Sequence, residues 1–168
     1  MVMPQPRTRI PDHLVPPTFT VGEARSAGVS RAVLRHDRFR TNFRGLRSTL
    51  ERPNGPDSLI ESTLYQSKVF LPALRPGEVF SHTTALLLMR CPIRCDQTLH
   101  VTTPGKDLRH RRPGLRGHRS SRPFEPMVDA EGIPLMPPAR ALEQAASILP
   151  LREVVVAIDH LLNQTQAT

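Results

Sequence analysis

The sequence has no tryptophan, a single tyrosine and only two cysteines among its 168 residues. Aromatic residues make up 4% of the chain, so we expect a modest core built from leucine, valine and alanine. No apolar run approaches the roughly 18 residues of a membrane-spanning helix, and the N-terminus has no apolar segment typical of a signal peptide. Cys91 and Cys95 fit a reducing compartment. These absences predict a cytoplasmic protein that has no membrane partner.

Lysine is almost absent, so the positive charge of the chain comes from arginine. Lys68 and Lys106 are the two lysines, yet the formal net charge is +8 at pH 7. Residues 19–52 carry eight arginines against three carboxylates, and residues 106–122 carry seven basic groups against one. The two blocks therefore have net charges of +5 and +6, which leaves −3 for the rest of the chain. Such a distribution is typical of a phosphate-binding surface.

The first basic block has the sequence features of two short helices followed by a hairpin. Thr20 and Glu23 have the spacing of a capping box, which predicts a helix over 21–27. Ser30 is suited to cap a second helix over 31–37. The segment FRTNFRGLRS that follows suits a hairpin of short strands.

A helix, a tight turn, a basic helix and a basic hairpin are the parts of a winged helix-turn-helix. In such a domain the second helix enters the major groove of DNA, and arginines of the wing contact phosphates. The same pattern also fits a plain helical hairpin whose arginines are only solvated. On the first interpretation the candidate DNA-binding residues are Ser30, Arg31, Arg35, Arg38, Arg40, Arg44, Arg47, Arg111 and Arg112.

Composition divides the chain into three parts. Residues 1–18 hold five prolines, which predicts an extended arm. Residues 19–52 form the predicted winged helix-turn-helix domain. The segment ERPNGPDS is typical of a linker, so residues 56–168 form a second domain.

The second domain mixes helical and strand patterns. Ser58 and Glu61 predict the start of a helix that reaches about Leu71, and SHTTALLLMR is typical of a buried helix. QTLHVTT alternates as a strand, with GLRGHRS as its expected neighbour, and MVDAEGIPLM suits a hairpin. Two helices, over 139–149 and 151–162, close the chain. The predicted fold class is therefore α+β, with a small mixed α/β domain after the winged helix.

A nuclease signature is not found around either lysine. Metal-dependent nucleases of the repair type place a carboxylate two positions before a lysine, because the lysine stabilises developing phosphate charge. The residue two positions before Lys68 is Gln66, and the one two positions before Lys106 is Pro104. Neither is a carboxylate. We therefore expect no catalytic residues and no enzymatic activity.

A metal site is not predicted either. Cys91 and Cys95 form one CxxxC pair, with His82 and His100 nearby in the sequence. Strong zinc signatures have two such pairs at defined spacing. We interpret the cysteines as packed thiols, and we expect no bound metal and no cofactor.

The second basic block, KDLRHRRPGLRGHRSSR, allows two interpretations. On the first, it is a basic loop and strand that lie along the DNA backbone beside the winged helix. On the second, it is a solvated loop or a surface that binds an acidic partner. The sequence does not show which way this block faces.

Six segments of the chain together suggest a family likeness. In chain order they are IPDHLVPPTFTVGEARSAGVSRAVLRHDRFRTNFRG, GEVFSHTTALLLMRCPI, LHVTTP, RRPGLRGHRS, EGIPLMPPARALEQAA and LPLREVVVAIDHLL. These segments resemble the AbiEi family of antitoxin-like transcriptional regulators. The chain is especially similar to the N-terminal region of bacterial proteins that continue into a very-short-patch-repair-like nuclease domain.

The resemblance implies a winged-helix DNA-binding domain followed by a mixed α/β domain. It further implies a promoter-binding autorepressor, paired with a nucleotidyltransferase-like toxin in a type IV toxin–antitoxin system. Double-stranded DNA and such a toxin are thus the expected partners, and the oligomeric state stays open. The alternative is a nuclease-less remnant of a repair-type endonuclease that acts as a DNA- or protein-docking module.

Overall fold

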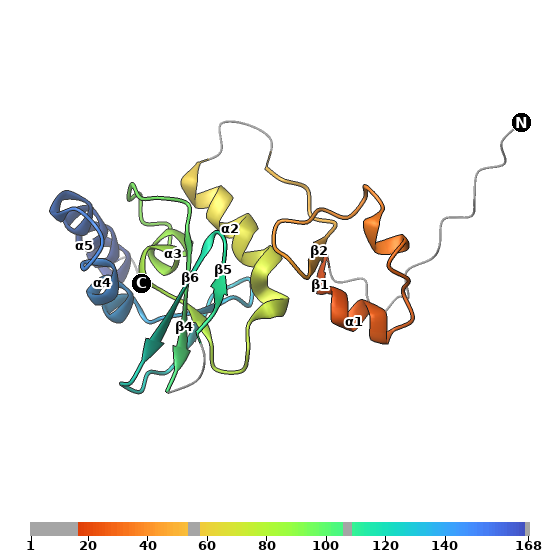
Figure 1. Cartoon of the computed structure of the whole chain (residues 1–168). Helices are drawn as coiled ribbons and strands as arrows, with labels where there is room; N and C mark the ends of the chain where they lie inside the picture. The colour runs from red at the N-terminus through yellow and green to blue at the C-terminus, as the bar shows by residue number, and fades with distance from the viewer. Residues whose placement is uncertain (1–16, 54–57, 106–108, 167–168) are drawn as a thin grey trace, which may run out of the picture.

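The structure is a computed structural model that describes residues 17–53, 58–105 and 109–166. Most of the predicted arm, the centre of the predicted linker and Lys106 lie outside the described residues. A small N-terminal unit occupies one end of the molecule, and a six-stranded sheet with its helices forms the rest (Figure 1). The fold is thus mixed α and β, as predicted.

Capping residues set the start of the N-terminal unit. Strand β1 (Thr18–Thr20) leads directly into helix α1 (Val21–Ser26). Thr20 Oγ1 accepts a hydrogen bond from the Glu23 amide at 3.0 Å, and the Glu23 carboxylate accepts one from the Thr20 amide at 2.8 Å. This reciprocal capping box confirms the predicted start of the helix. The helix ends before Gly28, whose φ of +84° lies in the left-handed region that favours glycine.

The predicted second helix is much shorter in the structure. In place of an α-helix over 31–37 there is one 3-10 turn, η2 (Val33–Arg35). The backbone becomes extended at His36, and this change of direction brings Phe39 into the small core of the N-terminal unit. There the ring of Phe39 packs edge-on against Phe19, with centroids 5.7 Å apart. Burial of this aromatic pair therefore outweighs continuation of the helix.

The strand pairing of the N-terminal unit also differs from the predicted hairpin. Strand β2 (Leu46–Ser48) pairs antiparallel with β1, which precedes the helices in sequence. Arg40 contributes an isolated bridge to β2, so the segment FRTNFRGLRS forms a loop more than a two-stranded wing. The winged-helix arrangement is not confirmed by the described residues.

The rest of the chain builds the large sheet and the helices around it. In chain order its elements are α2 (Leu59–Phe70), η3 (Leu71–Ala73), β3 (Val79–Phe80), α3 (His82–Leu88), β4 (Leu99–Pro104), β5 (Arg111–Arg112), β6 (Leu115–Ser120), β7 (Met127–Val128), β8 (Pro134–Leu135), α4 (Pro138–Ala145) and α5 (Leu151–Gln166). The strands lie in the order β5-β6-β4-β3-β8-β7. Helices α3, α4 and α5 gather on the side of the sheet away from the N-terminal unit (Figure 1).

The predicted strand neighbours are confirmed. Strands β4 and β6 pair along their length, with Leu99 opposite Leu115 and Thr102 opposite His118. The pairing is parallel, and β5 runs antiparallel to β6 at the edge of the sheet. Strands β7 and β8 form the predicted antiparallel hairpin.

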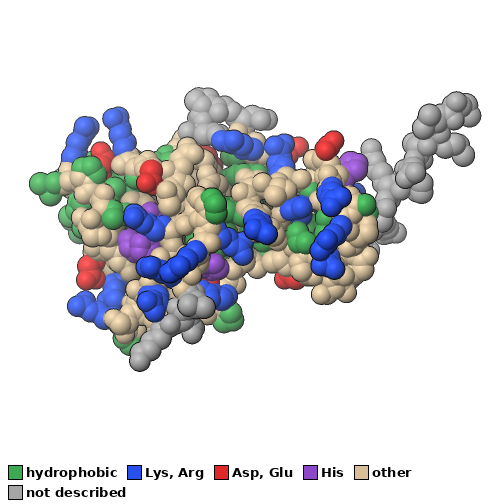
Figure 2. Space-filling view, viewed as in Figure 1, with side chains coloured by type: hydrophobic (Ala, Val, Ile, Leu, Met, Phe, Trp, Pro, Cys, Tyr) green, Lys and Arg blue, Asp and Glu red, His purple; other side chains and the backbone are tan. Residues whose placement is uncertain are grey.

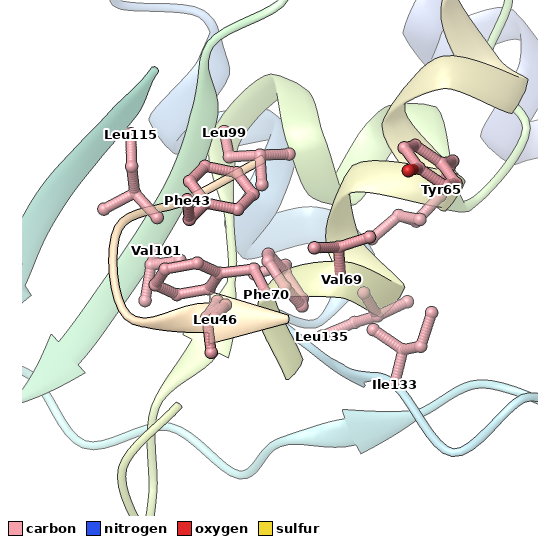
Figure 3. Packing of buried hydrophobic residues seen from close by; sticks show 12 residues of the cluster. Phe43, Leu46, Tyr65, Val69, Phe70, Leu99, Val101, Leu115, Ile133 and Leu135 are labelled. Carbon is pink, nitrogen blue, oxygen red and sulfur yellow. The ribbon is translucent and has the colours of Figure 1, made fainter. Parts of the chain in front are cut away.

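The N-terminal unit and the large sheet share a hydrophobic core. Phe43 and Leu46 are buried in the same cluster as Phe70 from α2 (Figure 3). The ring of Phe43 packs edge-on against that of Phe70, with centroids 5.2 Å apart. The regions predicted as separate domains, 19–52 and 56–168, are therefore joined by packed aromatic side chains as well as by the chain itself.

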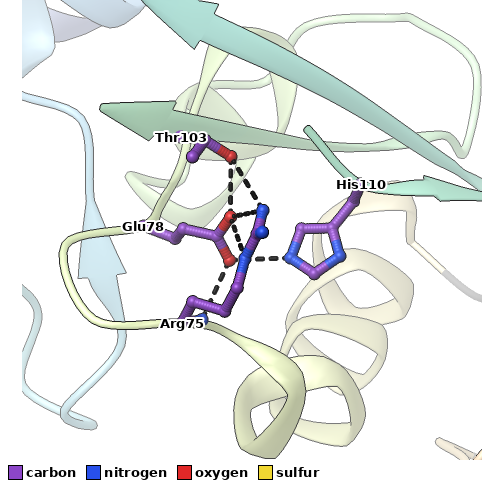
Figure 4. A network of polar contacts seen from close by, with 4 residues as sticks. All are labelled: Arg75, Glu78, Thr103 and His110. Carbon is purple, nitrogen blue, oxygen red and sulfur yellow. Dashed lines mark hydrogen bonds and ion pairs between the residues drawn. The ribbon is translucent and has the colours of Figure 1, made fainter. Parts of the chain in front are cut away.

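A buried carboxylate ties the second basic block to the centre of the sheet. Glu78 is 3% exposed and accepts hydrogen bonds from the Arg75 guanidinium and the Thr103 hydroxyl (Figure 4). Its other oxygen lies 2.7 Å from Nε2 of His110. The backbone of His110 passes so close to Gly117 that a Cβ there would lie 2.3 Å from the His110 carbonyl oxygen. Glycine at this position of β6 therefore lets the basic segment lie directly on the sheet.

Candidate functional site

The first group of predicted DNA-binding residues lies on and beside η2. Ser30 Oγ accepts a hydrogen bond from the Val33 amide at 3.3 Å, although the residue at the N-cap position of this turn is Ala32. Arg31, Arg35 and Arg38 are all exposed. The segment is on the side of the N-terminal unit that faces away from the large sheet (Figure 1). The side chains of Arg31 and Arg35 are thus accessible to a partner, whereas the guanidinium carbon of Arg38 lies 4.7 Å from the ring centre of Phe39.

The second group lies in the loop before β2 and on β2 itself. Arg40 and Arg44 are exposed. Arg47 is half-buried, and it donates hydrogen bonds from Nε to the Leu34 carbonyl and from Nη1 to the Leu46 carbonyl, both at 2.8 Å. Arg47 therefore holds the η2 segment against β2, and two of its nitrogens are already engaged within the protein.

The structure brings the two basic blocks of the sequence together. Arg112 on β5 donates a hydrogen bond from Nη1 to the carbonyl oxygen of Arg44 at 3.0 Å. Its guanidinium carbon also lies 5.8 Å from the ring centre of Phe70. Arg111 is exposed on the same short strand. Figure 2 shows lysine and arginine side chains spread over this face from the N-terminal unit to the large sheet. The second block therefore faces the first where the two meet.

Strands β5 and β6 line an open cavity of about 580 Å³. Four arginines line it, together with His110 and His118: Arg109, Arg111, Arg112 and Arg116. Guanidinium groups around an open concave surface favour anionic ligands with several acceptor oxygens, such as phosphates.

Beneath this surface, three histidines from three different elements form a cluster. His100 on β4 and His118 on β6 point to the same face of the sheet, because both are out of phase with the core residues Leu99 and Leu115. His82, the first residue of α3, covers them. Each histidine offers one ring nitrogen, and these three atoms all lie within 4.8 Å of one another.

The imidazole rings of the cluster are in direct contact. Nδ1 of His100 and Nε2 of His118 are 2.9 Å apart, so one donates a hydrogen bond to the other. The rings of His82 and His118 stack with centroids 3.7 Å apart. Nδ1 of His82 lies 3.0 Å from Ser81 Oγ, which also accepts a hydrogen bond from the Thr102 hydroxyl at 2.8 Å.

The cluster is held in its neutral form. Burial, followed by the neighbouring His118 and His100, lowers the pKa of His82 to about 3. Burial lowers the pKa of His100 to about 4, followed by the effect of His118. Burial and the nearby Arg116 lower the pKa of His118 to about 4. Near neutral pH all three rings therefore have unprotonated nitrogens that can bind a metal ion.

Sequence reasoning missed this cluster. It considered His82 and His100 only as neighbours of the cysteines, and it did not single out His118. The alternation of β4 and β6 gives the face of each strand. Parallel pairing of these strands and the position of α3 are tertiary features, however, and no local pattern showed them.

Both cysteines are free thiols in the structure. Cys91 is buried, which raises its pKa to about 11. Burial also raises the pKa of Cys95. Both therefore favour the protonated thiol, which is a poor nucleophile and a poor metal ligand.

Comparison with known proteins does not assign a family. No protein-family model matches the sequence, and the search of curated proteins gave no match. Among the helices of the described ranges, none combines the length and apolar character that crossing a membrane requires.

Proposed function

We propose that the protein binds double-stranded DNA through the face on which its two basic blocks meet. The observation that carries the proposal is the hydrogen bond from Arg112 to the Arg44 carbonyl. It joins a segment of charge +5 to one of charge +6, which lie far apart in the sequence. A surface of this kind neutralises backbone phosphates and releases counterions, which gives affinity without sequence preference.

Exposed arginines at both ends of this face support a duplex as the ligand. Arg31 and Arg35 lie at the outer end, on and beside η2, and Arg44 and Arg111 lie at the junction with the sheet. Several separated guanidinium groups can contact successive phosphates of a regular helix, whereas a small anion would need only one cluster. Phosphate contacts of this type fix the register of a protein on DNA.

The regulatory part of the proposal rests on the sequence resemblance. On that basis the protein acts as an AbiEi-like transcriptional regulator and antitoxin that binds rather than catalyses. A nucleotidyltransferase-like toxin encoded next to it would be its partner. Rescue of cells that express such a neighbouring gene, by co-expression of this chain, is the expected outcome.

DNA binding is tested by fluorescence anisotropy with a short duplex of random sequence at two salt concentrations. We expect binding in the micromolar range at low salt, with log affinity falling by about 0.9 per phosphate contact for each unit of log salt. Arg44→Ala and Arg111→Ala should each reduce this slope by about 1. The matched control is Arg152→Ala, because Arg152 is exposed on α5 at the opposite end of the molecule (Figure 1). Absence of binding at low salt, or equal weakening by the control, contradicts the proposal.

A further inference from the structure

The arrangement of the three histidines matches the donor set of a transition-metal site. Zn²⁺ is bound by imidazole nitrogens at about 2.0–2.1 Å, and sites with three protein ligands keep a fourth position open. Two such nitrogens in tetrahedral geometry are about 3.3 Å apart. The facing nitrogens of His100 and His118 are already 2.9 Å apart, and His82 completes the group within 4.8 Å. Rotation of the rings about their side-chain bonds would bring the three nitrogens around one ion.

A hydroxyl group is in place to orient one of the rings. Histidines that bind metal ions usually donate their other ring N–H to an oxygen, which fixes the tautomer and the ring position. Ser81 Oγ lies 3.0 Å from Nδ1 of His82, and Thr102 holds that hydroxyl from the other side. Nε2 of His82 is then left for the ion.

The backbone of His82 is strained at this position. Its φ is +52°, in the left-handed region, which costs a residue with a side chain roughly 1–3 kcal/mol. Arg90 also has a positive φ, of +65°, but it follows the end of α3, where a left-handed residue is the ordinary way to close a helix. His82 stands at the start of the same helix, where no such closure is needed. Strained residues of this kind cluster at ligand-binding sites.

The cluster is reached from solvent through a second cavity, of about 360 Å³. His82 and His118 form part of its wall together with Arg119, Arg122, Arg140 and Glu143, and Glu143 pairs with Arg122 and Arg140. Histidine binds a metal ion as the neutral imidazole, so a bound divalent ion would keep its full charge. The three arginines of the wall outnumber its one carboxylate, so the wall would draw an anion or a hydroxide to the open position.

We propose that His82, His100 and His118 bind one divalent transition-metal ion of the Zn²⁺ type, with the fourth position open towards this cavity. The site goes beyond the DNA binding proposed above and does not depend on it. It also replaces the expectation from the sequence that the protein binds no metal. That expectation was based on the cysteine pair, which contributes no ligand here.

Titration of the chelator-treated full chain with Co²⁺ tests the donor set without any substitution. We expect one ion per chain and the visible absorption bands of a site with nitrogen and oxygen donors. A charge-transfer band from thiolate to cobalt in the near ultraviolet would place the ion on Cys91 or Cys95 and overturn the proposal. Absence of stoichiometric binding would overturn it as well.

Calorimetric titration with Zn²⁺ then assigns the ligands. His118→Ala should weaken binding at least about 10-fold, the lower end of the effect seen when only a supporting group of a metal site is removed. His160→Gln and Cys95→Ser are the controls, because His160 contacts the Met89 carbonyl and lies outside the cluster. Both controls should bind as the unmodified chain does. Circular dichroism shows whether each variant is folded. If His118→Ala is unfolded, the cobalt spectrum of the unmodified chain decides whether the histidines are the ligands. Equal affinity of folded His118→Ala and the unmodified chain would overturn the proposal.

Discussion

Glu78 is a carboxylate removed from water among several hydrogen-bond donors, and its ionisation is therefore linked to the stability of the fold. Burial alone would raise its pKa, but hydrogen bonds from His110, Arg75 and Thr103 outweigh that effect and lower the pKa to about 2. The group lies where β3, β4 and the segment before β5 meet (Figure 4). Through its contact with His110, Glu78 thus anchors the second basic block to the sheet.

Replacing Glu78 by Gln tests this role. The ordinary pKa of 4.5 applies to the unfolded chain, so the ionised group stabilises the fold fully above about pH 4.5, and the effect disappears as the pH falls towards 2. A difference of this size corresponds to about 3 kcal/mol. We expect Glu78→Gln to lower the free energy of unfolding at pH 7 by about 2–3 kcal/mol, and we expect the gap to narrow below pH 4.5.

Urea denaturation of both proteins near neutral pH, at about pH 4 and at about pH 3 gives the comparison. Glu143→Gln is the matched control, since Glu143 is exposed and forms only surface ion pairs with Arg122 and Arg140. It should change stability by less than about 0.5 kcal/mol. A gap between Glu78→Gln and the unmodified chain that stays constant over this range would rule out the linkage.

Among the elements, those with strong local signals agree best with the sequence-based prediction. The capping residues Thr20 and Ser58 mark the first turns of α1 and α2, because a cap acts within three residues of itself. The hairpin of β7 and β8 also follows from residues close in sequence. No local sequence pattern indicates that β4 and β6 pair in parallel. The sequence predicted only that the two strands are neighbours in the sheet.

The 3-10 turn η2 shows where a local signal is overruled. The hydrogen bond from Val33 to Ser30 and the outward arginines fit the predicted recognition helix, yet the turn ends after Arg35. The packing of Phe39 against Phe19 stabilises the fold more than a longer helix in this short segment would. Arg31 and Arg35 stay exposed at this turn, so the prediction that they read bases can still be tested.

Replacement of arginines in the two elements should have different effects on DNA binding. We expect Arg31→Ala and Arg35→Ala to reduce the preference for a duplex enriched from a random library over a scrambled one, by roughly 1–3 kcal/mol for each base-reading side chain that is removed. Arg44→Ala should weaken binding to both duplexes alike, because a phosphate contact carries no sequence information. Competition binding of the two duplexes measures this. If Arg44→Ala changed the preference and the η2 variants did not, η2 would not be the reading element.

For the whole molecule, the sequence showed the charge of each basic block but not that the blocks adjoin. Their contact depends on how Phe43 packs against Phe70, an interaction between residues from two predicted domains. The histidine cluster likewise requires α3, β4 and β6 to be assembled first. Both candidate sites are thus products of tertiary packing, and single-sequence patterns could supply their residues but not their grouping.

If one shared core supports both sites, then a change at the junction should destabilise the whole chain in a single transition. Phe43 is 6% exposed, and removal of a buried phenylalanine ring costs roughly 3–5 kcal/mol. We expect Phe43→Ala to lower the unfolding midpoint while far-ultraviolet circular dichroism and the fluorescence of Tyr65 still report coincident transitions. Tyr65 is a suitable probe because it lies in this core and its hydroxyl donates a hydrogen bond to Asn42 in the N-terminal unit. Val128→Ala is the control, since Val128 is 64% exposed on β7. Separate transitions for the two probes, in either protein, would mean that residues 19–52 fold independently of the sheet, and the basic face would then not be held as one surface.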